Sequence, residues 1–482
     1  MLEVNSHKYL KKYYQNNLVL WPHNLTLTRL ISRSLIRKDN TFVQLSSDCA
    51  NFWWPGLLIP LCLYKNNIVL VLSEKQRRQL FDVELSKLRF SQLVFDYVEG
   101  IEITSSKKKI WVLSYQDLAL AYDKGLLKNR QLIFLESEFI PYELRKSLTM
   151  KISPKDWEHL IRSHSGLGAS IIEVHNRLSR RLFSQSVSSD AAVRIDSREI
   201  LLLKEILKDE LPSSMPWKRA FNSVNSEWVT WAELDNQTLS WDWYIQPLLP
   251  LQTLSGLFSE NTFLMLANSG QSDSFLLDLN SEKFSFNVKA KLGNRRDQEP
   301  IPLFVPRRQP LPNTALFYRH ILRQCQRLIL GRIHSTIILV DDFRLRRQLT
   351  SELAGEFGLR VVHETINIET NGIICCSCNW WIINQHKLPT PDQLIFPMIP
   401  LPPLESPWIA AKVDMLKHQR RNWFREFLLP ETLLRLLQST AIIRGKDVRV
   451  AILDGRMHYR SWGKSIFEAL EPWIALERLL PY

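Results

Sequence analysis

Short apolar runs alternate with amphipathic segments along most of the chain, and this alternation predicts its secondary structure. Residues 41–45, 68–72 and 109–114 are apolar enough to be buried strands, and a helix, or a loop that leads into one, follows each of them. Strands that alternate with helices are typical of parallel sheets covered by helices on both faces. The first part of the chain therefore predicts an α/β domain.

The same pattern restarts in the second half, where residues 262–267, 336–340 and 448–453 predict strands. Between the halves, residues 151–250 differ. They begin with helical segments at 155–184 and 197–210 and end in a tryptophan-rich piece that contains Trp217, Trp228, Trp231, Trp241 and Trp243. These rings can stack nucleic-acid bases, but filling a core or bracing two domains is the favoured interpretation.

Composition narrows the class of protein. The chain has 482 residues, and 62 Lys and Arg against 49 Asp and Glu give a net charge of +13, which suits a polyanionic partner. No run approaches the ~20 apolar residues of a membrane span, and the N-terminus lacks the apolar core of a signal peptide. Six cysteines are too few for a disulfide framework in so long a chain. We expect a cytoplasmic protein without a membrane segment.

One cysteine cluster, Cys375, Cys376 and Cys378, is a candidate metal or thiol site. It lacks a second pair of ligands and lies in a strand-like run. Burial as small hydrophobic residues is therefore the favoured interpretation, and no metal site is expected.

The C-terminal segment 427–473 carries a family resemblance. It is similar to the last conserved block of the DinG/XPD-type branch of superfamily 2 DNA helicases, in which a leucine-rich helix precedes Q-G-x-G-R and a strand ending L-D-x-R. The residues that match this block are Gln438, Arg444, Asp447, Leu453, Asp454, Arg456, Gly463, Lys464 and Phe467. Where the family has G-x-G-R, this chain has Ser-Thr-Ala-Ile at 439–442. The resemblance implies that the arginine directed at the γ-phosphate is missing.

The loop after the first strand corresponds to the family's phosphate-binding loop, G-x-x-x-x-G-K-[ST]. In an intact loop, glycines let backbone N–H groups approach the phosphates and the lysine meets their charge. Here residues 47–55 read Ser-Asp-Cys-Ala-Asn-Phe-Trp-Trp-Pro, without lysine or paired glycines. We expect an emptied pocket plugged by aromatic rings, at a degenerate loop whose candidate positions are Asp48, Asn51, Trp53, Trp54 and Gly56.

Residues 131–139 match the family's magnesium-and-water motif, D-E-A-H, in position and pattern. Leu135 replaces the magnesium aspartate, Glu136 corresponds to the catalytic glutamate and Glu138 replaces the histidine. Without a lysine opposite and a second carboxylate at the site, we expect these two glutamates to be solvated loop carboxylates rather than metal ligands. No cysteine lies between Leu63 and Ile140, where iron–sulfur members of the family place four, so we expect no iron–sulfur cluster.

Two groups of basic residues are candidates for nucleic-acid contact. Arg319, Arg323 and Arg327 repeat every four residues on one predicted helix, which fits either a phosphate-binding row or a solvated face. Arg420 and Arg421 lie in a second basic stretch. The surviving motif residues Arg456 and Lys464 complete the set.

The resemblance covers about residues 25–470 and implies an α/β fold with two RecA-like parallel-sheet domains. We expect a first RecA-like domain at 1–150, a mainly helical insertion at 151–250, a return to the first domain with a proline-rich connector at 251–315, and a second RecA-like domain at 316–482.

The function implied by the resemblance is that of a DinG-like helicase-related protein that binds DNA or RNA, in single-stranded form, with lost or much weakened ATPase activity. Its catalytic remnants are Glu136, Glu138, Gln438 and Arg444. No cofactor is expected, and ATP with magnesium enters only if the motifs still function. Two alternatives stay open, a non-catalytic scaffold on the same fold and an active helicase with unorthodox motifs.

Overall fold

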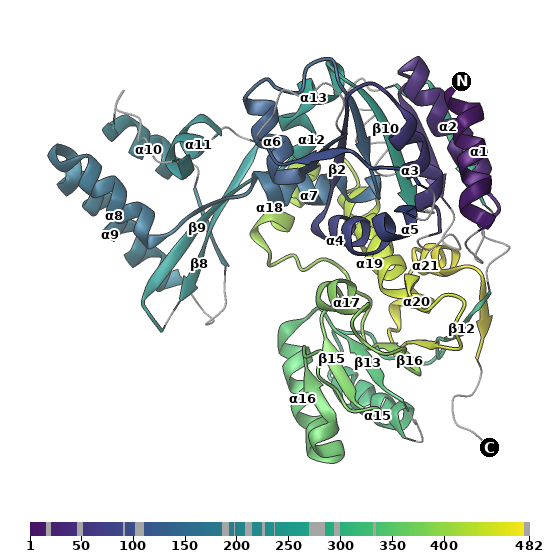
Figure 1. The fold of residues 1–482 in the computed structure, drawn as a ribbon. Coiled ribbons are helices and arrows are strands. Elements are labelled where there is room, and N and C mark those ends of the chain that lie inside the picture. The colour runs from purple at the N-terminus through teal and green to yellow at the C-terminus, as the bar shows by residue number, and fades with distance from the viewer. Residues whose placement is uncertain are drawn as a thin grey trace.

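The chain folds into two parallel-sheet domains, one above the other in Figure 1, and an insertion that projects sideways from the first domain. The computed structural model describes residues 1–15, 21–45, 52–89, 92–101, 110–185, 192–196, 198–207, 215–223, 227–235, 237–268, 285–293, 299–330 and 334–476. The predicted α/β class with two parallel sheets is confirmed.

The first domain contains a seven-stranded sheet in the order β11-β1-β10-β5-β2-β4-β3. All its pairings are parallel, which is why its central strands are buried on both faces and read as continuous apolar runs. Its strands are β1 (Thr41–Leu45), β2 (Ile68–Leu72), β3 (Tyr97–Glu99), β4 (Ile110–Ser114), β5 (Gln131–Phe134), β10 (Thr262–Asn268) and β11 (Val288–Leu292).

Helices cover both faces of this sheet. One face carries α1 (Leu2–Gln15), α2 (Asn24–Arg37), α3 (Trp54–Leu63), α4 (Glu74–Arg78), the π-helical turn η2 (Gln79–Glu84) and α5 (Leu85–Arg89). The other carries α6 (Tyr115–Asp123), the turn η3 (Ser137–Phe139), α7 (Ile140–Leu148), α12 (Pro250–Thr253) and α13 (Ser255–Ser259). The helical segment that follows β2 is interrupted by the π-helical turn η2.

The insertion combines helices with a four-stranded antiparallel sheet in the order β6-β9-β8-β7. The strands are β6 (Met150–Ile152), β7 (Ala192–Ile195), β8 (Trp228–Asp235) and β9 (Ser240–Pro247). The helices are α8 (Pro154–Ser163), η4 (Ser165–Leu167), α9 (Gly168–Gln185), α10 (Arg198–Leu207) and α11 (Met215–Ser223). The tryptophan-rich piece therefore forms strands as well as a helix. Its residues Trp217, Trp241 and Trp243 are buried in one core, as the core-filling interpretation predicted, and Trp157 of α8 lies in the same core.

The second domain contains seven parallel strands in the order β14-β15-β13-β16-β17-β12-β18. They are β12 (Ile301–Phe304), β13 (Thr336–Leu339), β14 (Val361–His363), β15 (Ile373–Cys376), β16 (Gln393–Phe396), β17 (Arg449–Ile452) and β18 (Trp473–Ala475). Because β12 pairs with β17 and β18, this domain begins before the predicted residue 316. The boundary was misplaced because prolines surround β12, and such a proline-rich composition is typical of a connector.

Helices α15 (Phe317–Ile329) and α16 (Phe343–Phe357) cover one face of the second sheet. Helices α17 (Cys378–Asn384), α19 (Leu429–Ala441), α20 (Arg456–Tyr459) and α21 (Gly463–Leu470) cover the other. Between β16 and α19, the chain leaves the second domain as helix α18 (Pro407–His418) and the π-helical turn η7 (Phe424–Leu428). We call residues 407–428 the arm, because α18 packs against β7 and β8 of the insertion (Figure 1).

Candidate functional site

Trp53 and Trp54, at the end of the segment that was expected to be a degenerate phosphate loop, lie in the first-domain core. Trp53 and Trp54 are 4% and 2% exposed, and their rings are stacked with centroids 4.7 Å apart. Both indoles belong to the cluster formed by α1, α2, α3 and the sheet. Asp48 and Asn51 lie outside the described residues. The two rings are therefore part of the domain's hydrophobic core.

Gly56 has a packing role at the start of α3. A β-carbon on Gly56 would lie 2.6 Å from Asn24 Oδ1 and 3.0 Å from Leu27 Cδ2, so α2 can approach α3 only because this residue is glycine. Asn24 Nδ2 also donates to the Phe52 carbonyl at 2.6 Å. The Thr28 hydroxyl donates to the Gly56 carbonyl at 3.3 Å. The helix turn that would follow a phosphate loop is thus fixed against α2.

Glu136, in the position of the catalytic glutamate, is held by α4. Its side chain is 17% exposed and lies 3.3 Å from the Lys75 ammonium. Gln76 Nε2 donates to the carboxylate at 3.1 Å and to the Leu135 carbonyl at 3.0 Å. The prediction of a solvated carboxylate is therefore wrong for Glu136, because Lys75 and Gln76 hold it. Glu138 is half-buried. The lysine comes from a charged helix whose orientation a sequence does not reveal.

The first and second domains meet near this pair. Burial lowers the pKa of His386, which follows α17 in the second domain, and the Lys75 charge lowers it further while Glu136 opposes that effect. On α7, the Arg145 guanidinium lies 3.8 Å from the ring centroid of Trp408 in the arm. Burial lowers the pKa of Arg145, and Glu431 of α19 counteracts this. Charged side chains from both domains therefore face each other here.

Helix α19 continues through the position of the family's glycine-rich turn. Ser439 and Thr440 are fully buried, and the Thr440 hydroxyl donates to the Leu436 carbonyl at 2.9 Å. Trp381 Nε1 donates to the Ser439 carbonyl at 2.9 Å, which fixes this turn against α17. Gln438 is half-buried on the same helix. Arg444 donates to the Leu470 and Glu471 carbonyls at 3.2 and 3.4 Å, so it holds the end of α21.

The L-D-x-R residues form a structural contact. Asp454 is fully buried and accepts the backbone N–H of Ile399 at 2.9 Å. The Arg456 guanidinium pairs with the same carboxylate, with Nη2 2.6 Å from Oδ2. The charge of Arg456 is therefore neutralised within the domain. Lys464 is 83% exposed and lies 3.6 Å from Glu468.

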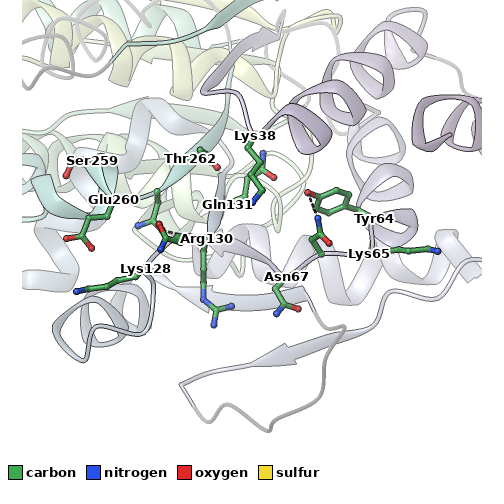
Figure 2. A pocket seen from close by; sticks show the side chains of 13 residues that line it. Lys38, Tyr64, Lys65, Asn67, Lys128, Arg130, Gln131, Ser259, Glu260 and Thr262 are labelled. Atoms are coloured by element: carbon green, nitrogen blue, oxygen red, sulfur yellow. Dashed lines mark hydrogen bonds between the residues drawn. The ribbon is translucent and has the colours of Figure 1, made fainter.

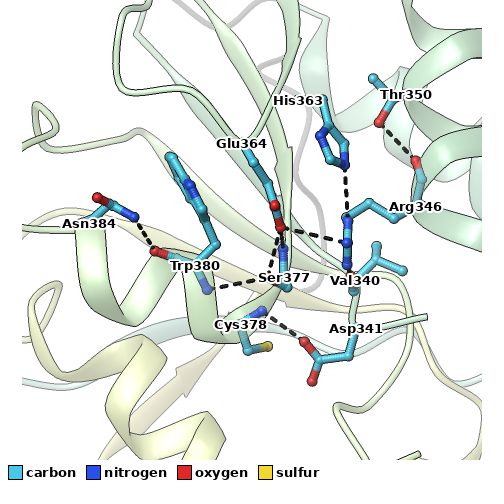
Figure 3. A network of polar contacts seen from close by, with 10 residues as sticks. All are labelled: Val340, Asp341, Arg346, Thr350, His363, Glu364, Ser377, Cys378, Trp380 and Asn384. Atoms are coloured by element: carbon cyan, nitrogen blue, oxygen red, sulfur yellow. Dashed lines mark hydrogen bonds and ion pairs between the residues drawn. The ribbon is translucent and has the colours of Figure 1, made fainter. Parts of the chain in front are cut away.

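A network of polar contacts joins the strand ends at the carboxyl edge of the second sheet (Figure 3). Arg346 donates to the Val340 carbonyl at 2.8 Å and to His363 Nε2 at 3.2 Å. Glu364 lies 3.7 Å from Arg346 and accepts the Ser377 N–H at 2.9 Å. These contacts connect the ends of β13, β14 and β15 with α16 and α17.

Asp341 and Asp342 lie between β13 and α16, at the carboxyl edge of the second sheet. Asp341 accepts the Cys378 N–H at 2.8 Å and pairs with Arg435 of α19 at 2.9 Å. Asp342 caps α16 by accepting the Leu345 N–H at 2.8 Å. Both carboxylates therefore have partners within the domain.

The predicted basic rows lie on different parts of the second domain. Arg319, Arg323 and Arg327 are all exposed on α15, which Figure 1 places on the side of the second domain facing away from the first. Arg420 and Arg421 are exposed in the arm, and Arg421 pairs with Glu426 at 2.6 Å. The structure does not bring these two groups together.

Half-buried aromatic rings accompany the basic residues of the arm. Lys417 Nζ lies 5.5 Å from the Trp423 ring centroid, and Phe424 contacts Trp462 with centroids 5.3 Å apart. We call this region the basic-aromatic surface. Its members in the arm are Lys417, Arg420, Arg421, Trp423, Phe424 and Arg425. The Phe424–Trp462 contact joins the arm to the segment around α20 and α21, whose members are Tyr459, Arg460, Trp462 and Lys464.

The cysteine cluster lies inside the second domain. Cys375, Cys376 and Cys378 are each 0% exposed, and burial raises the pKa of Cys375 to about 11. Across the described ranges, no group of three or more His, Cys, Asp or Glu side chains is placed to hold a metal ion. Within that same part of the chain, no helix is both long and apolar enough to cross a bilayer.

Known structures share this fold. An XPD helicase matches 95% of this chain and 100% of its own, with a TM-score of 0.62 and 11% identity. Xpd4 from S. tokodaii matches 93% of this chain and 98% of its own, with a TM-score of 0.61 and 11% identity. An apo XPD structure gives a TM-score of 0.59 at 11% identity, over 94% of this chain and 100% of that one.

No protein-family model matches the chain, and no curated protein matches its sequence. The two seven-stranded parallel sheets, together with this shared fold, confirm the predicted pair of RecA-like domains. At this level of identity the likeness concerns the fold.

Proposed function

We propose that this protein is a helicase-related, DinG/XPD-like protein that binds single-stranded nucleic acid and has lost most or all of its ATPase activity. The observation that carries this proposal is the packing at the start of α3. Trp54 is buried there, and Gly56 touches Asn24 of α2. Phosphoryl transfer depends almost wholly on positioning and on charge compensation, and a phosphate-loop lysine supplies both. This chain has no lysine at that position.

Other motif positions support a loss of catalysis. The turn that should carry the γ-phosphate arginine is replaced by buried Ser439 and Thr440 within α19. The surviving Arg456 is paired with buried Asp454. Leu135, in place of the magnesium aspartate, is fully buried. The family framework is thus retained by residues that stabilise the fold and do not handle phosphate.

Nucleic-acid binding is supported by the net charge of +13 and by the basic-aromatic surface. Arg420, Arg425 and Arg460 on that surface are exposed, and Trp423 and Trp462 are half-buried beside them. Cations that displace counterions from phosphates and rings that stack on bases are the usual elements of single-strand binding.

The test is equilibrium binding of a fluorescent oligo(dT) to the full chain at low and at moderate salt. Replacing Arg420, Arg425 and Arg460 by alanine should weaken binding at least about tenfold and reduce its salt dependence. The matched control replaces Arg319, Arg323 and Arg327, because each triple variant lowers the net charge of +13 by three. The control should bind nearly as well as the original chain.

The two alternative functions give different results. A non-catalytic scaffold would show no salt-dependent binding to the oligonucleotide. An active helicase is favoured by one observation, the Lys75 ammonium 3.3 Å from Glu136, which provides a cation next to the catalytic position. It would hydrolyse ATP faster when DNA is added.

A further inference from the structure

A cavity opens at the edge of the first sheet where its strands begin (Figure 2). Its volume is about 700 Å³, within the range of small-molecule sites. Asn67 comes just before β2, Gln131 is the first residue of β5 and Thr262 is the first residue of β10. Glu136 follows the other end of β5, so the cavity lies at the opposite edge of the sheet from the degenerate ATPase motifs.

The cavity is strongly basic. Its lining includes Lys38, Lys65, Lys128 and Arg130, against the single carboxylate of Glu260. Among the described residues, the three lysine ammonium groups have no hydrogen-bond or ion-pair partner. Unpaired cations around a concave surface attract an anion.

Helix ends offer another explanation for the lysines, because α2 and α3 end here and their last carbonyls carry partial negative charge. Several of these carbonyls already have other donors. The Leu35 carbonyl accepts the Tyr64 hydroxyl at 2.7 Å, and the Ser34 carbonyl accepts Gln131 Nε2 at 3.1 Å. The lysine side chains are therefore left for a ligand.

Gln131 adds a second, independent indication of a ligand. The residue is 4% exposed, and its Oε1 is buried without a hydrogen-bond partner. The bond from Nε2 to the Ser34 carbonyl fixes the amide so that the oxygen is the free atom. A buried carbonyl oxygen requires a donor. A ligand with a hydroxyl or N–H group would supply one.

Hydrogen bonds hold the walls of the cavity in place. Asn261 Oδ1 accepts the Arg130 N–H at 2.8 Å, and Asn261 Nδ2 donates to the Leu257 carbonyl at 2.7 Å. Asn66 Nδ2 donates to the Tyr64 hydroxyl at 3.1 Å. In Figure 2, Lys38 and Gln131 lie near the middle of the lining residues, while Lys65 and Lys128 lie on opposite sides.

We propose that this cavity binds a small phosphomonoester that also carries free hydroxyl groups, such as a sugar phosphate or a nucleoside monophosphate. The phosphate pairs with the ammonium groups of Lys38 and its neighbours, and a hydroxyl donates to Gln131 Oε1. Binding here is independent of the proposed nucleic-acid function, because it uses the opposite edge of the first sheet.

The experiment is calorimetric titration of the full chain with inorganic phosphate, ribose 5-phosphate and AMP at low salt. Ribose 5-phosphate should bind at least about tenfold more tightly than phosphate, since its sugar hydroxyls can donate to Gln131 while its phosphate stays paired with the lysines. If AMP binds more tightly than ribose 5-phosphate, the ligand is a nucleotide. If AMP binds more weakly than ribose 5-phosphate, the ligand is a sugar phosphate. No saturation by any probe up to ~10 mM would overturn the proposal.

Paired variants show whether the probes bind in this cavity. The double variant Lys38→Gln/Lys65→Gln should weaken all three probes at least about tenfold. The control Lys8→Gln/Lys11→Gln removes the same charge from the exposed face of α1 and should leave the affinities unchanged. Equal losses in both double variants would show a general charge effect and contradict the proposal. Gln131→Met should abolish the preference for ribose 5-phosphate over phosphate. If this variant does not fold, the lysine variants still test whether the cavity binds the probes.

Discussion

Glu364 combines an unfavourable backbone conformation with strong side-chain hydrogen bonds. It follows β14 with a φ of 43°, a left-handed conformation that non-glycine residues rarely adopt. Its carboxylate accepts both the N–H and the hydroxyl of Ser377, at 2.9 and 2.8 Å. A residue kept in this conformation by such bonds indicates that the surrounding network determines its geometry.

The pH dependence of stability tests this network. Burial raises the pKa of Glu364, but the bonds from Ser377 and the charge of Arg346 outweigh it, so the pKa lies below the ordinary value of 4.5. A lowered pKa stabilises the fold above the unfolded-state pKa, and this contribution is lost as pH falls through the folded-state value. We expect Glu364→Ala to reduce unfolding free energy by about 2 kcal/mol at neutral pH.

That deficit should shrink as the pH falls below about 4.5, because the original carboxylate is then protonated too. Urea unfolding at neutral and acidic pH measures the difference. A deficit that is the same at both pH values would show that the charge of Glu364 is not what the network uses.

Thiol reactivity tests the burial of the cysteines. The pKa of Cys62 is raised to about 12 and that of Cys375 to about 11, both mainly by burial, so neither is a thiolate near neutral pH. In a Cys49→Ser/Cys62→Ser variant, which leaves only the four buried cysteines, we expect the remaining thiols to react with a disulfide reagent only after denaturation. A rapidly labelled thiol in the native protein would contradict this burial.

At the scale of elements, α2 and α3 pack closely where we propose that a nucleotide site has been lost. We expect Gly56→Ala to destabilise the fold by about 1–3 kcal/mol, because its β-carbon would overlap Asn24. Asn24→Ala removes the overlapping oxygen, so the double variant should be more stable than the two single losses added together. Thermal unfolding of all three variants measures this coupling. A neutral Gly56→Ala would mean that α2 does not require glycine there.

Elements with strong apolar patterns could be predicted from the sequence. The strands at 41–45 and 68–72 have the predicted bounds, because a continuous apolar run of this length is distinctive. Strand β12 was not predicted, because it is four residues long and contains a proline. The tryptophan-rich strands β8 and β9 were not assigned as strands.

The candidate site depended on contacts that a sequence pattern does not contain. Lys75 and Glu136 are 61 residues apart, and Asp341 and Arg435 are 94 apart. Residue type indicated that phosphate-handling groups were missing. It did not indicate which new partners the surviving side chains would take, since that depends on how the helices pack.

At the scale of the whole molecule, the arm connects the second domain to the insertion and to the first domain. Trp408 Nε1 donates to the Pro247 carbonyl at 3.0 Å, and Arg145 stacks on the same ring. Arg194 pairs with Asp414 at 3.5 Å. Trp231 joins the same hydrophobic cluster, as the domain-bracing interpretation of the tryptophans predicted. These contacts restrain the relative movement of the two domains.

Calorimetric unfolding tests this coupling. We expect Trp408→Ala to cost about 3–5 kcal/mol and to separate one cooperative transition into two, because the ring is shared between domains. Tyr459→Ala removes a ring that is 59% exposed and should leave the transition unchanged. A single transition in the Trp408 variant at the original temperature would show that the arm does not couple the domains.

The central claim is that a helicase fold persists here without a working ATP site. Steady-state turnover of ATP with magnesium, measured with and without single-stranded DNA, tests it most directly. The claim predicts no DNA-stimulated turnover, and equal rates for the original chain and for Glu136→Gln. Turnover that rises with DNA and disappears in Glu136→Gln would contradict it.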